Sequence, residues 1–278
     1  MPRLALKIAH EGQGFHGSAQ QPGLATAEGE ILRALRRARI LSDVKAARFQ
    51  IASRTDRGVS ALGNVIAFNT SLGSVAAVRA LNAKLSRVWA WAVTEVVPDF
   101  DPRRARERWY RYELPPDHDI ERLQSALSLF TGEHDFRNFT RDRTRTVLRI
   151  DDANAIRAGD LIALDFRAPG FRWNLVRRLV SAALRVESNT VTLEQVARAL
   201  EGTARSDLGL ARPEGLTLMD VSFDFEFQSV EDPTTRDRVR RLRSDQLRSL
   251  RFVEAIVGRF EALPSATEAK TAFSDAIR

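Results

Sequence analysis

The sequence contains no cysteine, and this absence excludes disulfide bonds, thiolate metal sites and a cysteine nucleophile. Its four histidines, His10, His16, His118 and His134, are too scattered for their spacing to suggest a metal site. No stretch is apolar over the length of a membrane span, and the first 30 residues lack the apolar segment of a signal peptide. We therefore expect a cytoplasmic protein with no membrane association.

Lysine is also scarce, because only four of the 43 basic residues are lysines and the rest are arginines. The formal net charge is +7. Guanidinium groups bind phosphates in a bidentate manner and stack on bases, so an arginine-rich surface suits nucleic acid. Genome composition can produce the same bias, and composition alone leaves both explanations open.

The pattern of apolar residues predicts an α+β fold. A chain of 278 residues with 44% hydrophobic content can form one large or two ordinary domains. We infer two pseudo-related α+β lobes, residues 1–104 and 105–228, that share a mixed, mainly antiparallel sheet, and a helical tail over 229–278. The expected strands are 4–9, 49–51, 63–68, 88–93, 108–114, 161–166 and 216–223; the expected helices are 26–38, 75–85, 121–130, 173–185 and 193–200.

A charged loop over residues 52–61 separates two of these expected strands. It holds one carboxylate, Asp56, between Arg54 and Arg57, with Thr55 able to bond to the backbone and Gly58 able to form a sharp turn. Flanking positive charge favours the ionised carboxylate, which is suited to act as a nucleophile or a base. A solvated surface turn with a local ion pair explains the same residues, and the loop alone does not choose between the two interpretations.

A second polar stretch, residues 137–149, is rich in arginine. Asp142 is its single acid, and we expect a mobile or RNA-facing loop. Its basic residues are Arg137, Arg141, Arg143, Arg145 and Arg149.

The motif Ser-Arg-Thr-Asp-Arg-Gly-Val-Ser-Ala at residues 53–61 resembles the active-site signature of the TruA family of tRNA pseudouridine synthases. Further stretches resemble other family motifs in the same order, so that the resemblance covers roughly residues 3–223. These stretches are Gly-Gln-Gly-Phe-His-Gly at 12–17, Gln-Gln-Pro at 20–22, Asn-Val-Ile-Ala-Phe at 64–68, Arg-Trp-Tyr-Arg-Tyr at 108–112, Gly-Glu-His-Asp-Phe-Arg-Asn-Phe at 132–139, Gly-Phe-Arg-Trp-Asn-Leu-Val-Arg-Arg-Leu-Val at 170–180 and Pro-Glu-Gly-Leu at 213–216.

The resemblance implies that Asp56 is the catalytic aspartate in a cleft between the lobes. Tyr110 would stack on the target base and is a candidate for proton removal, whereas Arg177 would pair with Asp56 and orient it. Arg54 would help to displace the target nucleotide from its stack. The resemblance also implies tRNA as the partner, action in the anticodon stem-loop, a homodimer, and neither a cofactor nor a metal. The other expected substrate-binding residues are Thr55, Arg57, Arg141 and Arg143, and Arg57 has no definite role.

Three positions depart from the common bacterial pattern. Ser18, Arg57 and Ser60 stand where many bacterial members have Trp, Ala and His, and in this respect the chain is more similar to archaeal and eukaryotic members. These departures affect expected substrate contacts and not the expected reaction.

Several alternatives stay open at the level of sequence. Asp56 can attack the anomeric carbon of the sugar, or it can start a glycal route by removing a neighbouring proton. A noncatalytic tRNA-binding or RNA-folding protein could retain the fold and the arginines. A hydrolase of nucleosides or glycosides would need a second carboxylate, and no partner for Asp56 is identifiable in the sequence.

Overall fold

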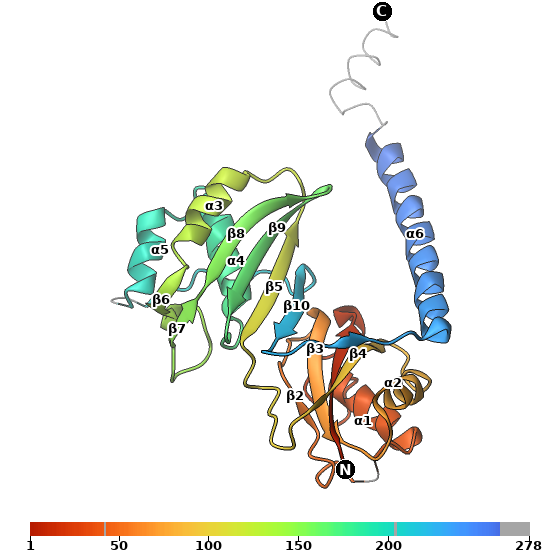
Figure 1. Cartoon of the computed structure of the whole chain (residues 1–278). Helices are drawn as coiled ribbons and strands as arrows, with labels where there is room; N and C mark the ends of the chain where they lie inside the picture. The colour runs from red at the N-terminus through yellow and green to blue at the C-terminus, as the bar shows by residue number, and fades with distance from the viewer. Residues whose placement is uncertain (42, 203–204, 262–278) are drawn as a thin grey trace, which may run out of the picture. The chain divides into compact units, whose positions relative to one another are not determined.

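A nine-stranded sheet is the central element of the computed structural model, which describes residues 1–41, 43–202 and 205–261 (Figure 1). The strand order is β11-β4-β1-β3-β10-β5-β9-β8, and β2 pairs with β3. All paired strands are antiparallel except β3 and β10, which run parallel. The expected mixed, mainly antiparallel sheet is therefore confirmed. The strands are β1 Arg3–His10, β2 Gln50–Ile51, β3 Ser60–Asn69, β4 Val88–Val96, β5 Glu107–Leu114, β8 Asp152–Ala158, β9 Leu161–Ala168, β10 Leu216–Ser222 and β11 Gln228–Ser229.

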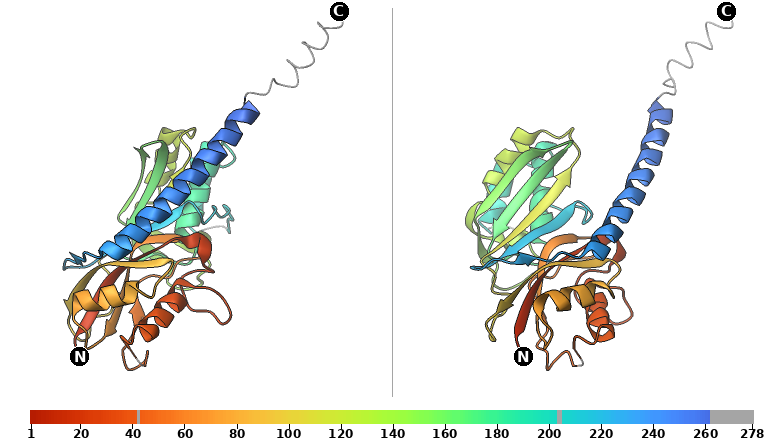
Figure 2. Two further views of the ribbon diagram at one scale, coloured as in Figure 1. Left: turned by 90° about the vertical axis from the view of Figure 1, so that its right-hand side faces the viewer. Right: turned by 45° about the vertical axis from the view of Figure 1, so that its right-hand side comes forward.

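Two helices, α1 (Ala27–Arg37) and α2 (Ser74–Asn82), cover one face of the first half of this sheet (Figure 2). The Thr26 hydroxyl accepts a hydrogen bond from the Gly29 amide at 3.2 Å, which caps α1 as the sequence predicted. Leu4, Leu6 and Ile8 alternate along β1 and pack in one buried cluster with residues of both helices. The strand and the helix expected here are confirmed.

Three helices, α3 (Ile120–Ser128), α4 (Leu175–Glu187) and α5 (Leu193–Leu200), form a second core with β5, β9 and β8. Phe130, Phe136 and Phe139 are fully buried in this core and meet edge to face. The second core also includes Ala5 and Val65 from the first half of the sheet, and residues 1–231 form one compact unit.

The prediction of a loop over residues 137–149 is wrong at both ends of this range. A 3-10 helix, η2 (Phe136–Asn138), occupies its beginning, and strand β7 (Val147–Ile150) starts before its end and pairs with β6 (Gly132–Asp135). Leu148 is half-buried and Ile150 is buried, whereas Arg149 between them is exposed. Residues 147–150 follow a period-two pattern that is typical of a strand with one solvent-exposed face, and the neighbouring arginines made this short pattern difficult to recognise in the sequence.

Residues from Asp232 onward form a second compact unit. Its described part is the helix α6 (Pro233–Glu261), which confirms a helix in the expected tail, and residues 262–278 lie outside the described residues. The lobe boundary at residues 104 and 105 stays a prediction. Within the described ranges, no helix has both the length and the apolar character needed to cross a bilayer.

Candidate active site

The loop that carries Asp56 is held by the loop that follows β1. The Ser18 hydroxyl accepts a hydrogen bond from the Thr55 amide at 2.7 Å, and the Ser18 amide donates to the Thr55 carbonyl at 3.0 Å. Both residues are buried. Gly58 then turns the chain with a φ of 83°, a conformation that side chains disfavour. These contacts fix the backbone on both sides of Asp56.

The charged loop that the sequence predicted over residues 52–61 ends earlier than residue 61. Ser60 and Ala61 belong to β3, because they pair in parallel with Thr217 and Leu218 of β10. This is the parallel contact that joins the two halves of the sheet. Asp56 therefore lies just before the place where the two halves meet.

A buried arginine that the sequence analysis did not single out supports the start of the same loop. Arg108 Nε donates to Ser53 Oγ at 2.8 Å, and Nη2 donates to the carbonyl oxygens of Ala52 at 3.1 Å and of Arg103 at 2.9 Å. Its Nη1 donates to the carbonyl of Pro169. Burial lowers the pKa of Arg108. Period two along β5 places Arg108 on the same face as Tyr110, and this signal could have revealed it.

Arg177 contacts Asp56 directly. Its Nη1 lies 3.1 Å from Asp56 Oδ2, and its Nε donates to the carbonyl of Ala211 at 2.8 Å. The Arg177 side chain is 12% exposed and the Asp56 side chain is 26% exposed. Because the Ala211 carbonyl holds the guanidinium, Arg177 can orient one carboxylate oxygen while the carboxylate stays accessible.

Tyr110 is a buried residue of β5 whose ring meets Phe171 edge to face at 5.2 Å. Burial raises the pKa of Tyr110 to about 12; the charge of Arg108 opposes this shift, and the charge of Asp56 adds to it. The phenol is therefore neutral near pH 7, and it supplies an aromatic ring and a hydroxyl but no resting negative charge.

His10 lies beneath the loop and was not identified as a site residue from the sequence. Its Nε2 is 3.5 Å from Thr55 Oγ1, and its ring meets Phe15 edge to face. Burial lowers the pKa of His10 to about 4, so the imidazole is neutral near pH 7.

One cavity of about 1120 Å³ brings most of the predicted residues together. Arg141 and Arg143 are outside its lining: Arg141 lies over the Trp173 ring at 5.3 Å, and Arg143 is exposed. The predicted residues that line the cavity are Arg54, Thr55, Asp56, Arg57, Tyr110 and Arg177.

The fold also brings two further acids, Glu28 and Asp142, to the cavity, although the sequence showed no partner for Asp56. A Glu28 carboxylate oxygen accepts a hydrogen bond from the Gln20 backbone amide at 2.9 Å, and an Asp142 oxygen accepts one from the Trp173 backbone amide at 3.1 Å. Each of these acids therefore anchors backbone, whereas Asp56 is held by a guanidinium.

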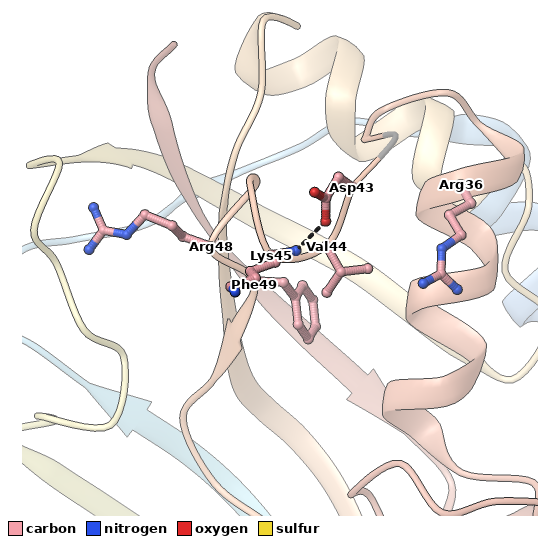
Figure 3. A pocket seen from close by; sticks show the side chains of 6 residues that line it. All are labelled: Arg36, Asp43, Val44, Lys45, Arg48 and Phe49. Carbon is pink, nitrogen blue, oxygen red and sulfur yellow. Dashed lines mark hydrogen bonds between the residues drawn. The ribbon is translucent and has the colours of Figure 1, made fainter.

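A second hollow of about 540 Å³ lies beside α1 and contains none of the predicted site residues (Figure 3). Its acid, Asp43, accepts a hydrogen bond from the Lys45 amide at 2.7 Å and so stabilises a turn. Arg36, Lys45 and Arg48 supply its positive charge. Among the described residues that line this hollow, no carboxylate is paired with an arginine as Asp56 is with Arg177, so we do not regard it as the candidate active site.

Comparison with known proteins gives a consistent result. Residues 126–224 match the family described as tRNA pseudouridine synthase. The chain is 39% identical to "tRNA pseudouridine synthase A" of Methanococcoides burtonii, over 92% of this chain and 95% of that protein. It is 40% identical to the protein of the same name from Pyrococcus furiosus, over 81% and 86% of the two chains. The protein of that name from Methanothermobacter thermautotrophicus is 36% identical over 100% of this chain and 97% of its own length.

Proposed function

We propose that this chain, which belongs to the tRNA pseudouridine synthase A family, isomerises uridine to pseudouridine in tRNA. The observation that carries the proposal is the Asp56–Arg177 contact at 3.1 Å in a cavity that Tyr110 also lines. In the reaction, the bond between the sugar and the base nitrogen breaks, the base rotates while bound, and a bond to the base carbon forms. The carbon loses a proton and the nitrogen gains one, so no redox step is required.

Asp56 is the proposed catalytic carboxylate. It attacks the anomeric carbon, or it removes a neighbouring sugar proton and starts a glycal route. Arg177 is the proposed positioning partner, because it contacts one oxygen of Asp56 and is itself held by the Ala211 carbonyl. The accessible part of the carboxylate faces the cavity that would receive the nucleotide.

Tyr110 is proposed to contact the target base. Its pKa of about 12 means that it can accept a proton from the base carbon only while passing its own proton to another group. Asp56 is the acceptor we propose, since it lines the same cavity as Tyr110. Stacking on the base does not depend on this transfer.

The substrate must be flipped out of its stack before it reaches Asp56, at a cost of about a few kcal/mol. Arg54 and Arg57 are exposed residues of the cavity lining, and we propose that Arg54 helps to displace the nucleotide. Arg141 and Arg143 lie outside the lining and are proposed contacts to the rest of the tRNA. We further propose action in the anticodon stem-loop, a homodimer and a cytoplasmic location, as the family resemblance and a tRNA substrate suggest.

The decisive experiment is Asp56→Asn with an unmodified tRNA transcript. We expect tRNA binding within a few-fold of wild type and no pseudouridine, because the variant retains the shape of the side chain but loses the charged oxygen. Asp43→Asn is the matched control, since Asp43 lies in the other hollow. Unchanged pseudouridine formation in Asp56→Asn would refute the role of Asp56, and no product from the wild type would favour a noncatalytic tRNA-binding protein.

A hydrolase of nucleosides or glycosides is the second candidate function. Such an enzyme needs a second carboxylate, and Glu28 and Asp142 also line the cavity. Both of these acids bind backbone amides, and neither forms an ion pair with an arginine in the part of the chain that the structure describes, whereas Asp56 does. Release of free uracil from tRNA by the wild type would identify a hydrolase, whereas pseudouridine retained in the chain would exclude it.

A further inference from the structure

Trp173 is an exposed aromatic residue in the lining of the catalytic cavity. The Trp173 residue is 53% exposed, compared with 40% for Trp91, whereas Trp89 and Trp109 are half-buried. The Trp109 indole nitrogen donates to Asp165, and that of Trp91 donates to the Leu62 carbonyl. Among the residues that the structure describes, the Trp173 indole nitrogen makes no hydrogen bond.

The backbone of Trp173 is fixed although its ring is exposed. Its amide donates to Asp142 at 3.1 Å, and its carbonyl accepts from Thr140 Oγ1 at 3.0 Å and from the Arg141 amide at 3.3 Å. Asn174, the next residue, has a φ of 63°, a left-handed conformation that is uncommon outside glycine. The segment that carries the Trp173 ring lies immediately before α4, and these hydrogen bonds hold it against the loop at 140–142.

The Arg141 guanidinium lies over the Trp173 ring at 5.3 Å from its centroid. A positive charge beside an exposed ring suits a phosphate-linked base, because the ring can stack on the base while the guanidinium attracts the phosphate. Phe171, two residues before Trp173, also lines the cavity and meets Tyr110 edge to face. The segment at 171–173 thus connects the proposed site of the target base with the exposed ring.

We propose that Trp173 is a stacking site for a second unpaired nucleobase, one that neighbours the flipped uridine in the RNA. This inference rests on the proposed function, since it takes RNA as the substrate. Flipping a nucleotide removes a stacking partner from its neighbours, and the indole ring would replace that partner. Arg141 is assigned to the adjacent phosphate, which gives this residue a contact although it lies outside the cavity lining.

The test is the affinity for an unmodified tRNA transcript, measured at several salt concentrations. Trp173→Ala should weaken binding by about 10-fold, since stacking of one base contributes an effect of this size. Trp173→Phe should restore binding to within about 3-fold, because a smaller aromatic ring still stacks. The slope of affinity against salt should stay unchanged in both variants, whereas Arg141→Gln should reduce that slope.

Trp91→Ala is the matched control, because Trp91 is also exposed but lies on β4 outside the cavity lining. It should bind tRNA as the wild type does. Indole fluorescence gives a second measurement that does not require the alanine variant to fold: tRNA should quench the wild type and Trp91→Phe, and the quenching should be reduced in Trp173→Phe. Binding of folded Trp173→Ala within 2-fold of wild type would overturn the proposal.

These results separate the inference from the proposed function. If the wild type forms no pseudouridine but loses tRNA affinity on Trp173→Ala, the stacking site stands and the activity does not. If pseudouridine forms normally and both binding and fluorescence are insensitive to Trp173, the stacking site is refuted and the activity stands.

Discussion

Arg177 Nη1 lies 3.1 Å from Asp56 Oδ2, although 121 residues separate the two in the chain. Arg177 is on α4, in the second core, whereas Asp56 is in the loop between β2 and β3. The contact depends on the parallel pairing of β3 with β10, which joins the two halves of the sheet. Any change that displaces α4 from that junction should therefore alter the orientation of Asp56.

Removing the Arg177 side chain should reduce pseudouridine formation by at least about 100-fold, because a misplaced carboxylate loses its alignment with the sugar. Arg177→Ala should remain folded, since the arginine contributes one ion pair and one carbonyl contact. Single-turnover kinetics would measure the loss. Arg185→Ala, an exposed position on the same helix, should turn over normally, and near-normal turnover of Arg177→Ala would contradict the positioning role.

Tyr110→Phe should separate stacking from proton transfer. The phenylalanine ring keeps the stacking surface, so tRNA affinity should be retained, but turnover should fall by about 100-fold or more if the hydroxyl relays a proton. Tyr110→Ala should lower affinity as well. Binding assays combined with single-turnover rates would distinguish the two variants, and a Tyr110→Phe variant with wild-type turnover would leave stacking as the role of this residue.

Arg108→Leu should destabilise the protein by roughly 2–4 kcal/mol, because it removes the donor to one buried and two partly buried carbonyl groups. The affected acceptors include the carbonyls of Ala52, Arg103 and Pro169. Urea unfolding would measure the change in the free energy of unfolding. Arg106→Leu, at an exposed position just before β5, should change it little, and equal effects of the two substitutions would contradict the structural role of Arg108.

Because His10 is buried, we expect the free energy of unfolding to decrease in mild acid. Burial lowers its folded-state pKa from 6.5 to about 4, so the unfolded chain takes up a proton first as the pH falls. The stabilisation is complete above about pH 6.5 and is lost between about pH 6.5 and 4, with a total effect of about 3 kcal/mol. Unfolding at pH 4.5 and 7.5 should show a smaller difference for His10→Phe than for the wild type, whereas the exposed His16→Gln should behave as the wild type does.

Affinity for tRNA should fall steeply with salt, because phosphate contacts release counterions. The exposed arginines of the site region are the expected contributors, namely Arg54, Arg57, Arg141 and Arg143. Titrations between about 50 and 200 mM salt would measure the slope. A flat response would indicate that the arginine content reflects composition and not RNA binding.

The sequence by itself determined the elements whose signals are local. Thr26 capped its helix as expected, and Leu4, Leu6 and Ile8 formed the inward face of a strand, because caps and periodicities are set by residues a few positions apart. The order of the motifs likewise indicated the family. Strand β7 was missed, since arginines on its solvent face obscured an apolar pattern of only a few residues.

Only the tertiary structure decided which side chains meet. The sequence could not show that Arg108 supports the loop, that Glu28 and Asp142 reach the cavity, or that Arg141 covers Trp173. The family resemblance suggested the pairing of Arg177 with Asp56, but its geometry required the fold. The physical reason is that such contacts depend on strand pairing and helix packing between distant segments, and no pattern within a single segment encodes them.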